Sequence, residues 1–247
     1  MNLTEQLYNR QAKSWARSKP EILSDYTARP RVLELAGDLT NKHVLDLGCG
    51  EGYVSRLMKK QQAESVIGID ISMEMISLAR EAATAENMHY YCVDVLEADV
   101  YKPETFDLVV AVFLFNYLNI PQSEDLLKKI YSTLKPGGRF LFTIPHPCKP
   151  FMAKHEFPFY FKTTGDYLHS RNKLFEGKIW KFNGEFVEVS CVHKTLGDYF
   201  QMLSNAGFSK FPVVEELFVT PELLRLNESF FGPLKGLPLH MLFSLEK

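Results

Sequence analysis

Strand-like and helix-like segments alternate from residue 43 to residue 144, and this alternation limits the chain to a small set of folds. Five segments are predicted strands: HVLDLG, SVIGID, HYYCVDV, FDLVVAVFLF and RFLFTIP. Their nearly uninterrupted apolar runs are typical of strands covered on both faces. Helices are predicted between them near 53–61, 73–85 and 122–134. Repeated strand–helix–strand units need right-handed crossovers, so we predict an α/β fold with a doubly wound, mostly parallel sheet.

The flanking segments follow other patterns. Residues 2–18 and 22–38 are predicted helices, the second burying Leu33, Leu35 and Ala36. Residues 145–193 lack helical periodicity, and the strands KIWKF and EFVEVSCV around an Asn-Gly step predict a β-hairpin. A helix from Thr195 to Ala206 and strands near FPVVEELF and LPLHMLFSL complete the chain. We expect one domain over 1–247, with 145–193 as a β-rich insertion after the fifth strand.

Composition excludes several classes of protein. The 28 basic and 30 acidic residues give a net charge of −2, which does not favour a nucleic-acid partner. The N-terminus has no apolar signal region, and no apolar run is long enough for a membrane helix. The four cysteines are widely spaced and form no CxxC pair, so neither a disulfide framework nor a metal site is indicated. We expect a cytoplasmic protein with no membrane partner and no metal.

The loop VLDLGCGEGY after the first strand has alternating glycines, as loops that approach a ligand closely often do. It is not a dinucleotide fingerprint, because Tyr53 stands where the last glycine belongs, and it lacks the Lys-Ser/Thr pair of a phosphate loop. Asp46 and Glu51 lie in it, and no basic residue follows before Arg56. Such a loop favours a ligand that is cationic where the two meet.

Two more acids follow the next strands. Asp70 ends GIDIS, where an acid can accept hydrogen bonds from ribose hydroxyls, and Asp94 ends YCVDV at the same edge. Three acids at three successive strand ends favour a nucleoside ligand with a positive portion. S-adenosylmethionine, with its sulfonium and ammonium groups, is such a molecule.

VLDLGCGEGY, GIDIS, YCVDV, FDLVVAVFLFNYL and LKPGGRFLFTIPHP resemble, in order and spacing, the motifs of class I S-adenosylmethionine-dependent methyltransferases. The resemblance is strong over 43–147 and looser from HKTLGDYFQMLSNAGF onward. It implies a Rossmann-like fold of seven strands with the last antiparallel, and N-terminal helices within 1–40 that cover the cofactor.

The resemblance also implies the cofactor contacts. Asp46 with the loop at Gly48, Cys49 and Gly50 is expected to hold the methionine moiety, and Asp70 the ribose. For the adenine it implies contacts with Ile71 or Met73, Asp94 and Val95, and for the methionine backbone contacts with Val112 and Phe113. Arg29, with Arg31 as a competitor, is expected to pair with the cofactor carboxylate, and Tyr8 is expected near the reactive methyl group.

The acceptor is less constrained. Val112-Phe113-Leu114-Phe115 replaces the Asn/Asp-Pro-Pro-aromatic motif of family members that methylate planar nitrogens. Cys148 follows a proline, as the nucleophilic cysteine of cytosine C5 methyltransferases does, but it comes after the fifth strand instead of the fourth. The alternative is that Cys148 is a buried thiol with no role in catalysis. Ten aromatic residues between 151 and 186 predict a lid over an apolar or aromatic metabolite. A separate hairpin core, a dimer contact or nucleic-acid stacking are the alternatives.

Several side chains are candidates for the acceptor pocket. His146 follows the fifth strand and is the candidate base or acceptor ligand, against a structural role. Other candidates are Tyr8 and Trp15 on the first helix, Asn116 after the fourth strand, and Tyr160, Tyr167, Trp180 and His193 in or after the insertion. The other histidines, including His240, show no functional signal.

The sequence therefore predicts methyl transfer from S-adenosylmethionine, leaving S-adenosylhomocysteine, to an oxygen or nitrogen of a small metabolite. An RNA or protein methyltransferase, or a binding protein that has lost catalysis, are the alternatives. A monomer and a homodimer are equally compatible with the sequence, which defines neither the acceptor nor the pathway.

Overall fold

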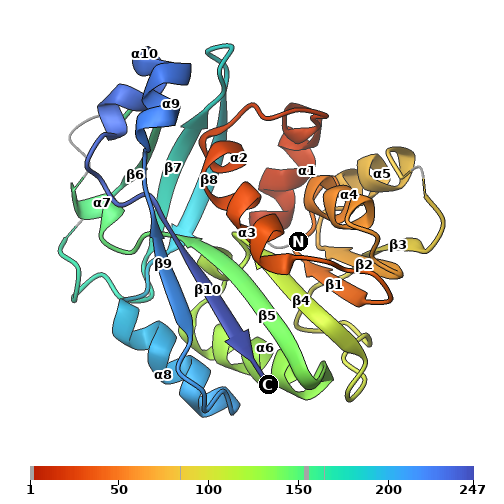
Figure 1. Ribbon diagram of the computed structural model, residues 1–247. Coiled ribbons are helices and arrows are strands. Elements are labelled where there is room, and N and C mark those ends of the chain that lie inside the picture. The colour runs from red at the N-terminus through yellow and green to blue at the C-terminus, as the bar shows by residue number, and fades with distance from the viewer. Residues whose placement is uncertain (1–2, 84, 153–155, 164) are drawn as a thin grey trace.

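The computed structural model describes residues 3–83, 85–152, 156–163 and 165–247. A seven-stranded sheet with the order β3-β2-β1-β4-β5-β10-β9 forms its centre (Figure 1). Its strands are β1 (His43–Leu47), β2 (Ser65–Asp70), β3 (Met88–Cys92), β4 (Phe106–Val112), β5 (Leu134–Pro145), β9 (Val213–Leu217) and β10 (His240–Glu246).

Strand directions agree with the prediction. The pairs among β1, β2, β3, β4 and β5 are parallel, whereas β10 runs antiparallel to both β5 and β9. The predicted seven-stranded, mostly parallel sheet with an antiparallel last strand is therefore confirmed. Because the order reverses at β1 and β4, the carboxyl ends of these two strands border the crevice where open α/β sheets bind ligands.

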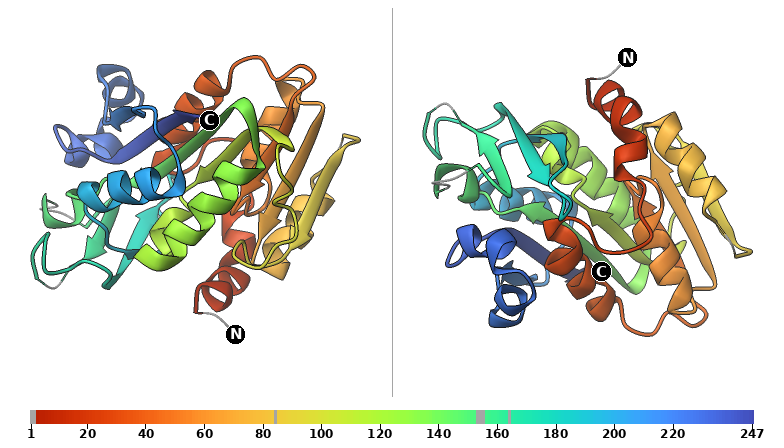
Figure 2. Two further views of the ribbon diagram at one scale, coloured as in Figure 1. Left: turned by 90° about the horizontal axis from the view of Figure 1, so that it is seen from below. Right: turned by 90° about the horizontal axis from the view of Figure 1, so that it is seen from above.

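Helices cover both faces of the sheet (Figure 2). On one face, α6 (Ile120–Thr133) and α8 (Leu196–Ala206) bury Leu126, Ile130 and Met202 against β4 and β5. On the other, α3 (Ala28–Ala36) buries Val32 against β5 and β10, and α4 (Tyr53–Lys60) buries Met58 against β2, while α5 (Met73–Glu81) packs on β2 and β3. Two apolar layers thus fix the sheet edge that carries the glycine loop.

The insertion forms a second sheet, as predicted. Strands β6 (Phe159–Lys162), β7 (Leu174–Trp180) and β8 (Phe186–Val192) pair antiparallel in that order. Alternation along them turns Phe159, Phe161 and Val189 inward, where they share a core with Leu23 and with the C-terminal helices α9 (Pro221–Leu226) and α10 (Glu228–Phe231). We call β6, β7 and β8 the lid sheet.

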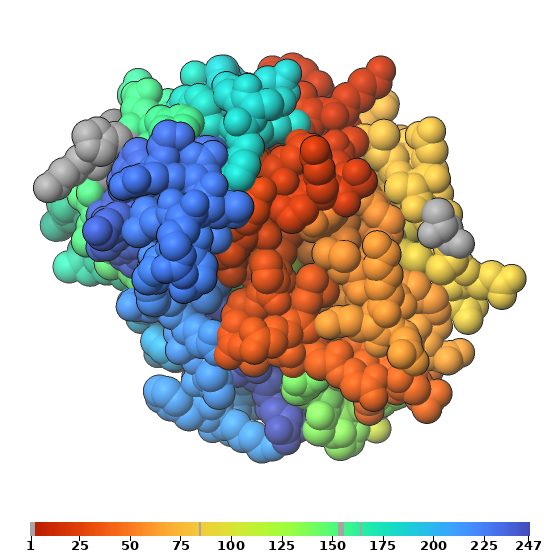
Figure 3. Space-filling view, turned by 45° about the horizontal axis from the view of Figure 1, so that its top comes forward, coloured from red at the N-terminus to blue at the C-terminus, as the bar shows by residue number. Residues whose placement is uncertain are grey.

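Helix α1 (Leu3–Trp15) closes the free edge of the lid sheet. The Gln11 side chain accepts a hydrogen bond from Glu188 N (2.8 Å) and donates one to Glu188 O (3.1 Å), so it pairs with β8 as a strand would. In Figure 3 the N-terminal segment, in red, lies on the surface between the blue and cyan segments and the orange helices. It therefore bridges the lid sheet and the central domain.

Some local predictions are wrong. Residues 22–38 form two helices, α2 (Leu23–Tyr26) and α3, because the chain bends at Thr27; Val32 and Ala36 are buried, whereas Leu33 and Leu35 are only partly so. The short helices α7 (Lys149–Met152), α9 and α10 were not predicted, since four to six residues carry little periodicity. No helix in the described part of the chain is long and apolar enough to span a membrane.

Candidate functional site

The glycine loop turns sharply after β1. Gly48 N and Cys49 N donate to Ile69 O (2.8 and 3.0 Å), which ties the loop to β2. Gly48, Gly50 and Gly52 have φ of 68°, 55° and 77°. A Cβ on Gly52 would lie 2.6 Å from the Tyr90 hydroxyl, whereas a Cβ on Gly50 would meet nothing within 4 Å. Gly52 is therefore needed for packing, and Gly50 borders open space.

That open space is a cavity at the carboxyl edge of β1, β2 and β4. It measures about 1460 Å³ counting its open mouth and the solvent space in it. Its walls come from the loop and strand ends on one side and from α1, η1 (Phe115–Tyr117) and the lid sheet on the other. The predicted residues that line it are Tyr8, Trp15, Arg29, Asp46, Gly48, Cys49, Gly50, Asp70, Ile71, Asp94, Val95, Val112, Phe113 and Asn116.

Two acids are held at the cofactor side of the cavity. Asp46 is buried and accepts a hydrogen bond from Ser55 Oγ (2.5 Å); burial raises its pKa to about 7. Asp70 accepts from Gly50 N and Ser72 N, both at 2.9 Å, and burial raises its pKa as well. Since desolvation disfavours the carboxylate form, a ligand that brings positive charge or hydrogen-bond donors is favoured here.

Glu51 differs from the sequence-based interpretation. It is buried and forms ion pairs with Arg17 (3.1 Å) and Arg56 (2.6 Å), so its charge is already neutralised. Its pKa is nevertheless raised, since burial outweighs the two arginines. Glu51 thus anchors α1 and α4 to the loop, and it does not act as a free acid for a ligand.

A buried carboxylate orients the positive charges. Asp25 accepts from Arg17 Nε and Nη2 (both 2.9 Å) and from Arg29 Nη1 (3.0 Å). Burial alone would raise the pKa of Asp25, but Arg29 and Arg17 hold it below its usual value. All hydrogen bonds that Arg29 forms with described residues run through Nη1, which leaves the N–H groups of Nε and Nη2 for another partner.

The competing Arg31 lies elsewhere. Its guanidinium binds Glu215 (2.7 and 2.8 Å) and Glu34, linking α3 to β9 on the surface. Arg29, in contrast, lines the cavity and stacks 5.7 Å from the centre of the Phe113 ring. Of the two arginines, only Arg29 faces the candidate ligand.

Aromatic hydroxyls meet at the opposite wall. The Tyr8 and Tyr117 hydroxyls form a short hydrogen bond, and the Trp15 ring lies 5.8 Å from that of Tyr8. Burial raises the pKa of Tyr117 to about 12 and that of Tyr8 far above its usual value. Both phenols are therefore uncharged at neutral pH, and in the bond between them one hydroxyl donates and the other accepts.

Six predicted site residues, Met73, His146, Tyr160, Tyr167, Trp180 and His193, do not line this cavity. His146 is occupied structurally: Nε2 meets Glu216 (3.0 Å) and Nδ1 accepts from Cys148 N (3.1 Å). His193 binds Tyr167 O (2.8 Å), and Tyr167 Oη accepts from Leu196 N. Met73 is 55% exposed at the start of α5, and Tyr160 and Trp180 pack together on the outer face of the lid sheet.

The sequence analysis missed other lining residues. Met75 lines the cavity in place of Met73, and Phe159 and Phe161 face it because they occupy alternate positions of β6. His240 also lines it, since antiparallel pairing sets it opposite Pro145 at the end of β5. A signal for Phe159 and Phe161 existed in the period-two pattern FYFK. His240 had none, because its position follows from sheet order.

His240 is the uncharged histidine of the site. The Thr27 hydroxyl donates to Leu23 O (3.1 Å), so its oxygen accepts from His240 Nδ1 (2.9 Å). That tautomer leaves Nε2 as an acceptor. Burial, and then Arg29 and Lys149, lower the pKa of His240 to about 3. The described residues contain no cluster of three or more His, Cys, Asp or Glu side chains that could hold a metal ion.

Comparison with known sequences identifies a domain. The model of a family described as "Methyltransferase domain" matches residues 44–138. A Coxiella burnetii "Ubiquinone biosynthesis O-methyltransferase" is 31% identical over 56% of this chain and 61% of its own length. A Priestia megaterium "Malonyl-[acyl-carrier protein] O-methyltransferase" is 32% identical over 40% of this chain and 35% of its own length. The chain thus spans less than two thirds of the length of these relatives.

Solved structures share the fold. An S-adenosylmethionine dependent methyltransferase from Mesorhizobium loti superposes with a TM-score of 0.68 at 23% identity, covering 88% of this chain and 96% of that one. A Haemonchus contortus phosphoethanolamine N-methyltransferase, solved with S-adenosyl-L-methionine, gives a TM-score of 0.58 at 19% identity over 89% of this chain and 52% of the other. At these identities the match establishes the fold alone.

Proposed function

We propose that this chain is a class I S-adenosylmethionine-dependent methyltransferase and that it transfers a methyl group from S-adenosylmethionine to an oxygen or nitrogen of a small, largely apolar metabolite. The observation that carries the proposal is the two-sided cavity, with acids and arginines on one side and aromatic side chains on the other. We further propose that residues 1–40 and 145–193 close the site and that the reaction takes place in the cytosol.

The residues of the cofactor side fit the proposed group. An amino-acid tail needs a cation for its carboxylate and an acceptor for its ammonium, and Arg29 and Asp46 supply these. Asp70 is the acceptor for ribose hydroxyls, with Asp94 beyond it. The empty space beside Gly50 admits a ligand directly against the backbone. Arg29 has N–H groups to spare, and buried Asp46 has a raised pKa, so both gain from such a ligand.

S-adenosylmethionine, when bound, supplies an activated methyl group on a sulfonium centre. The protein then has to position the cofactor and the methyl acceptor, exclude water from them and orient them toward each other. Arg29 and Asp46 fix the amino-acid tail, Tyr8 and α1 exclude water, and the lid sheet holds the acceptor. We assign to uncharged His240 the task of accepting a hydrogen bond from the acceptor, which orients it toward the methyl group.

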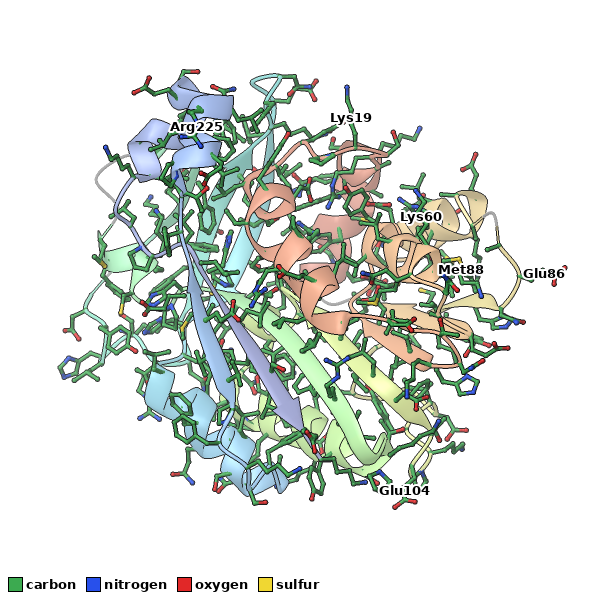
Figure 4. The ribbon with its side chains drawn as sticks, in the orientation of Figure 1. Lys19, Lys60, Glu86, Met88, Glu104 and Arg225 are labelled. Carbon is green, nitrogen blue, oxygen red and sulfur yellow. The ribbon has the colours of Figure 1, made fainter. Side chains whose placement is uncertain are left out.

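The alternatives have weaker support. Binding RNA needs a one-sided basic surface. In Figure 4 the labelled Lys19, Lys60 and Arg225 lie on separate elements, and Glu86 and Glu104 lie at other edges of the molecule. The cavity lining also extends to Phe159 and Phe161 of the lid sheet, which a protein that only binds the cofactor does not need. Both observations favour an enzyme that acts on a small molecule.

The proposal is tested by following the methyl group. The protein is incubated with methyl-labelled S-adenosylmethionine and, separately, with a metabolite extract, total RNA and a protein extract from the same cells. We expect label in the metabolite fraction extracted by organic solvent. Label confined to RNA or protein would overturn the assignment of the acceptor, and no label in any fraction would favour a protein without catalysis.

Gly50→Ala is expected to weaken binding of S-adenosylhomocysteine because its methyl group enters the cavity. The control is Gly137→Ala, since Gly137 also has a positive φ (73° against 55°), an equally open Cβ position and a site on the surface. Each change costs about 1–2 kcal/mol of unfolding free energy, because alanine disfavours positive φ. Calorimetric titration should show weaker binding in Gly50→Ala alone; equal affinities would place the ligand elsewhere.

A further inference from the structure

Two buried polar atoms in the cavity have no partner. Six buried side-chain nitrogen or oxygen atoms of the described residues form no hydrogen bond, and two of these belong to residues that line the cavity: Trp15 Nε1 and Asn116 Oδ1. Asn116 is only 3% exposed, and its amide nitrogen donates to Ser190 O (3.3 Å), which sets the direction of its oxygen. Since buried polar groups are normally satisfied, these two atoms at the cavity wall are free to form hydrogen bonds with a bound ligand.

Both atoms lie on the aromatic side. The Trp15 ring neighbours that of Tyr8, whose hydroxyl binds Tyr117, and Tyr117 is adjacent to Asn116 in the chain. One orphan is a donor and the other an acceptor. A ligand that satisfies both must therefore bring one acceptor and one donor.

The charged groups next to this side are already paired. Arg17 Nη1 donates to Trp15 O (3.0 Å), and the Arg17 guanidinium forms ion pairs with Asp25 and Glu51. The acids that line the cavity, Asp46, Glu51, Asp70 and Asp94, come from the glycine loop and the ends of β1, β2 and β3. The lining arginines, Arg17 and Arg29, are held by Asp25. A carboxylate or an ammonium on the acceptor would thus be desolvated without an unpaired opposite charge beside it, at a high free-energy cost.

The remaining walls are apolar and favour a flat ring. Phe159 and Phe161 stand at 77° to each other with centroids 5.3 Å apart, and Ile179 and Val189 come from the neighbouring strands. Aromatic rings pack well in offset or edge-to-face contact with such side chains. A hydroxyl group on the ring supplies a donor and an acceptor without adding charge.

We propose that the aromatic side of the cavity recognises an uncharged aromatic molecule that carries hydroxyl groups, with Trp15 Nε1 donating to it and Asn116 Oδ1 accepting from it. The inference rests on the proposed function, because it places the methyl acceptor there. It names Trp15 and Asn116 as the residues that set acceptor specificity. It also predicts rejection of carboxylates of the same size.

Three probe molecules that share a fluorinated benzene ring test the proposed chemical class of the acceptor. Fluorine NMR measures the binding of 4-fluorophenol, fluorobenzene and 4-fluorobenzoate to the protein saturated with S-adenosylhomocysteine. We expect 4-fluorophenol to bind about three- to tenfold more tightly than fluorobenzene, the range that neutral hydrogen bonds provide, and 4-fluorobenzoate to bind no better than fluorobenzene. No preference for 4-fluorophenol, preference for 4-fluorobenzoate, or no binding of any probe would overturn the inference without any variant.

Matched variants test the residues. Trp15→Phe and Asn116→Leu should each remove most of the preference for 4-fluorophenol. The controls are Trp180→Phe, at the other of the two tryptophans, and Thr143→Val, which removes another orphan hydroxyl that does not line the cavity. Both controls should keep the preference. Its retention in Trp15→Phe and Asn116→Leu would contradict the assignment.

Calorimetric titration of the same samples with S-adenosylhomocysteine separates this inference from the proposed function. If S-adenosylhomocysteine binds and the preference for 4-fluorophenol is missing, only the acceptor class is wrong. If S-adenosylhomocysteine does not bind, the proposed function fails. The three probes are then compared without it, and the same preference decides whether the aromatic side recognises hydroxylated rings.

Discussion

Replacing Asp25 with alanine is expected to lower the free energy of unfolding by about 3–5 kcal/mol, because it leaves Arg17 and Arg29 buried without their shared carboxylate. The Asp25 side chain is fully buried and also accepts from Glu21 N (3.0 Å) and Ile22 N (3.2 Å), so its loss frees two backbone donors as well. Urea denaturation measures the change.

The control for Asp25 is Asp99→Ala. Asp99 also pairs with a basic residue, Lys102 (2.6 Å), but its side chain is 93% exposed. Exposed pairs contribute at most about 1 kcal/mol, so this variant should unfold close to wild type. A change in Asp25→Ala no larger than that in Asp99→Ala would contradict the role of Asp25 as the organiser of the N-terminal segment.

The effect of Asp25 should also depend on pH. The pKa of Asp25 in the folded protein lies below its unfolded value of about 3.9, so its contribution to stability is complete above that pH. It is lost as the pH falls through the folded pKa. The difference between wild type and Asp25→Ala should therefore narrow in acid and stay constant near neutral pH.

Asp70→Asn is expected to weaken binding of S-adenosylhomocysteine by about 1–3 kcal/mol, roughly 5- to 150-fold, because charged acceptors form the stronger hydrogen bonds with hydroxyls. Asp70 also shapes the loop through Gly50 N and Ser72 N. The binding constant is measured by calorimetry alongside the unfolding curve, so that a folding defect is recognised.

Asp38→Asn is the matched control for Asp70→Asn. Asp38 accepts from the backbone N–H two residues later, Thr40 N at 2.9 Å, as Asp70 does from Ser72, but it lies on the surface. Its substitution should leave the affinity unchanged. Equal affinities of Asp70→Asn and wild type would exclude Asp70 from the ligand site.

The sheet and the glycine loop follow from local patterns, which is why the sequence predicts them. Successive strand residues such as Val44 and Leu45 are buried in the cores on opposite faces of the sheet, and this produces continuous apolar runs that a single segment displays. Asp70 and Asp94 line the cavity because parallel strands end at one edge. Such positions can be predicted from the order of the strands along the chain alone.

The aromatic side of the cavity depends on long-range packing, which local patterns do not encode. His240 reaches the site through antiparallel pairing with Pro145, far away in sequence. His146 directly follows β5, yet its side chain meets Glu216 and the Cys148 backbone. Glu51 looked free because its partner Arg17 lies 34 residues away. In each case a residue from an element distant in sequence determines the position and the hydrogen bonds of the side chain.

The central claim is that the glycine-loop side of this cavity binds S-adenosylmethionine. Isothermal titration calorimetry of the wild-type protein with S-adenosylhomocysteine, the product that retains the nucleoside and the amino-acid tail, tests it most directly. We predict a one-to-one complex with a dissociation constant near micromolar, about −8 kcal/mol, and much weaker binding of adenosine, which lacks the tail that Arg29 and Asp46 hold. Absence of binding at millimolar S-adenosylhomocysteine, or equal affinity for adenosine, would contradict the account.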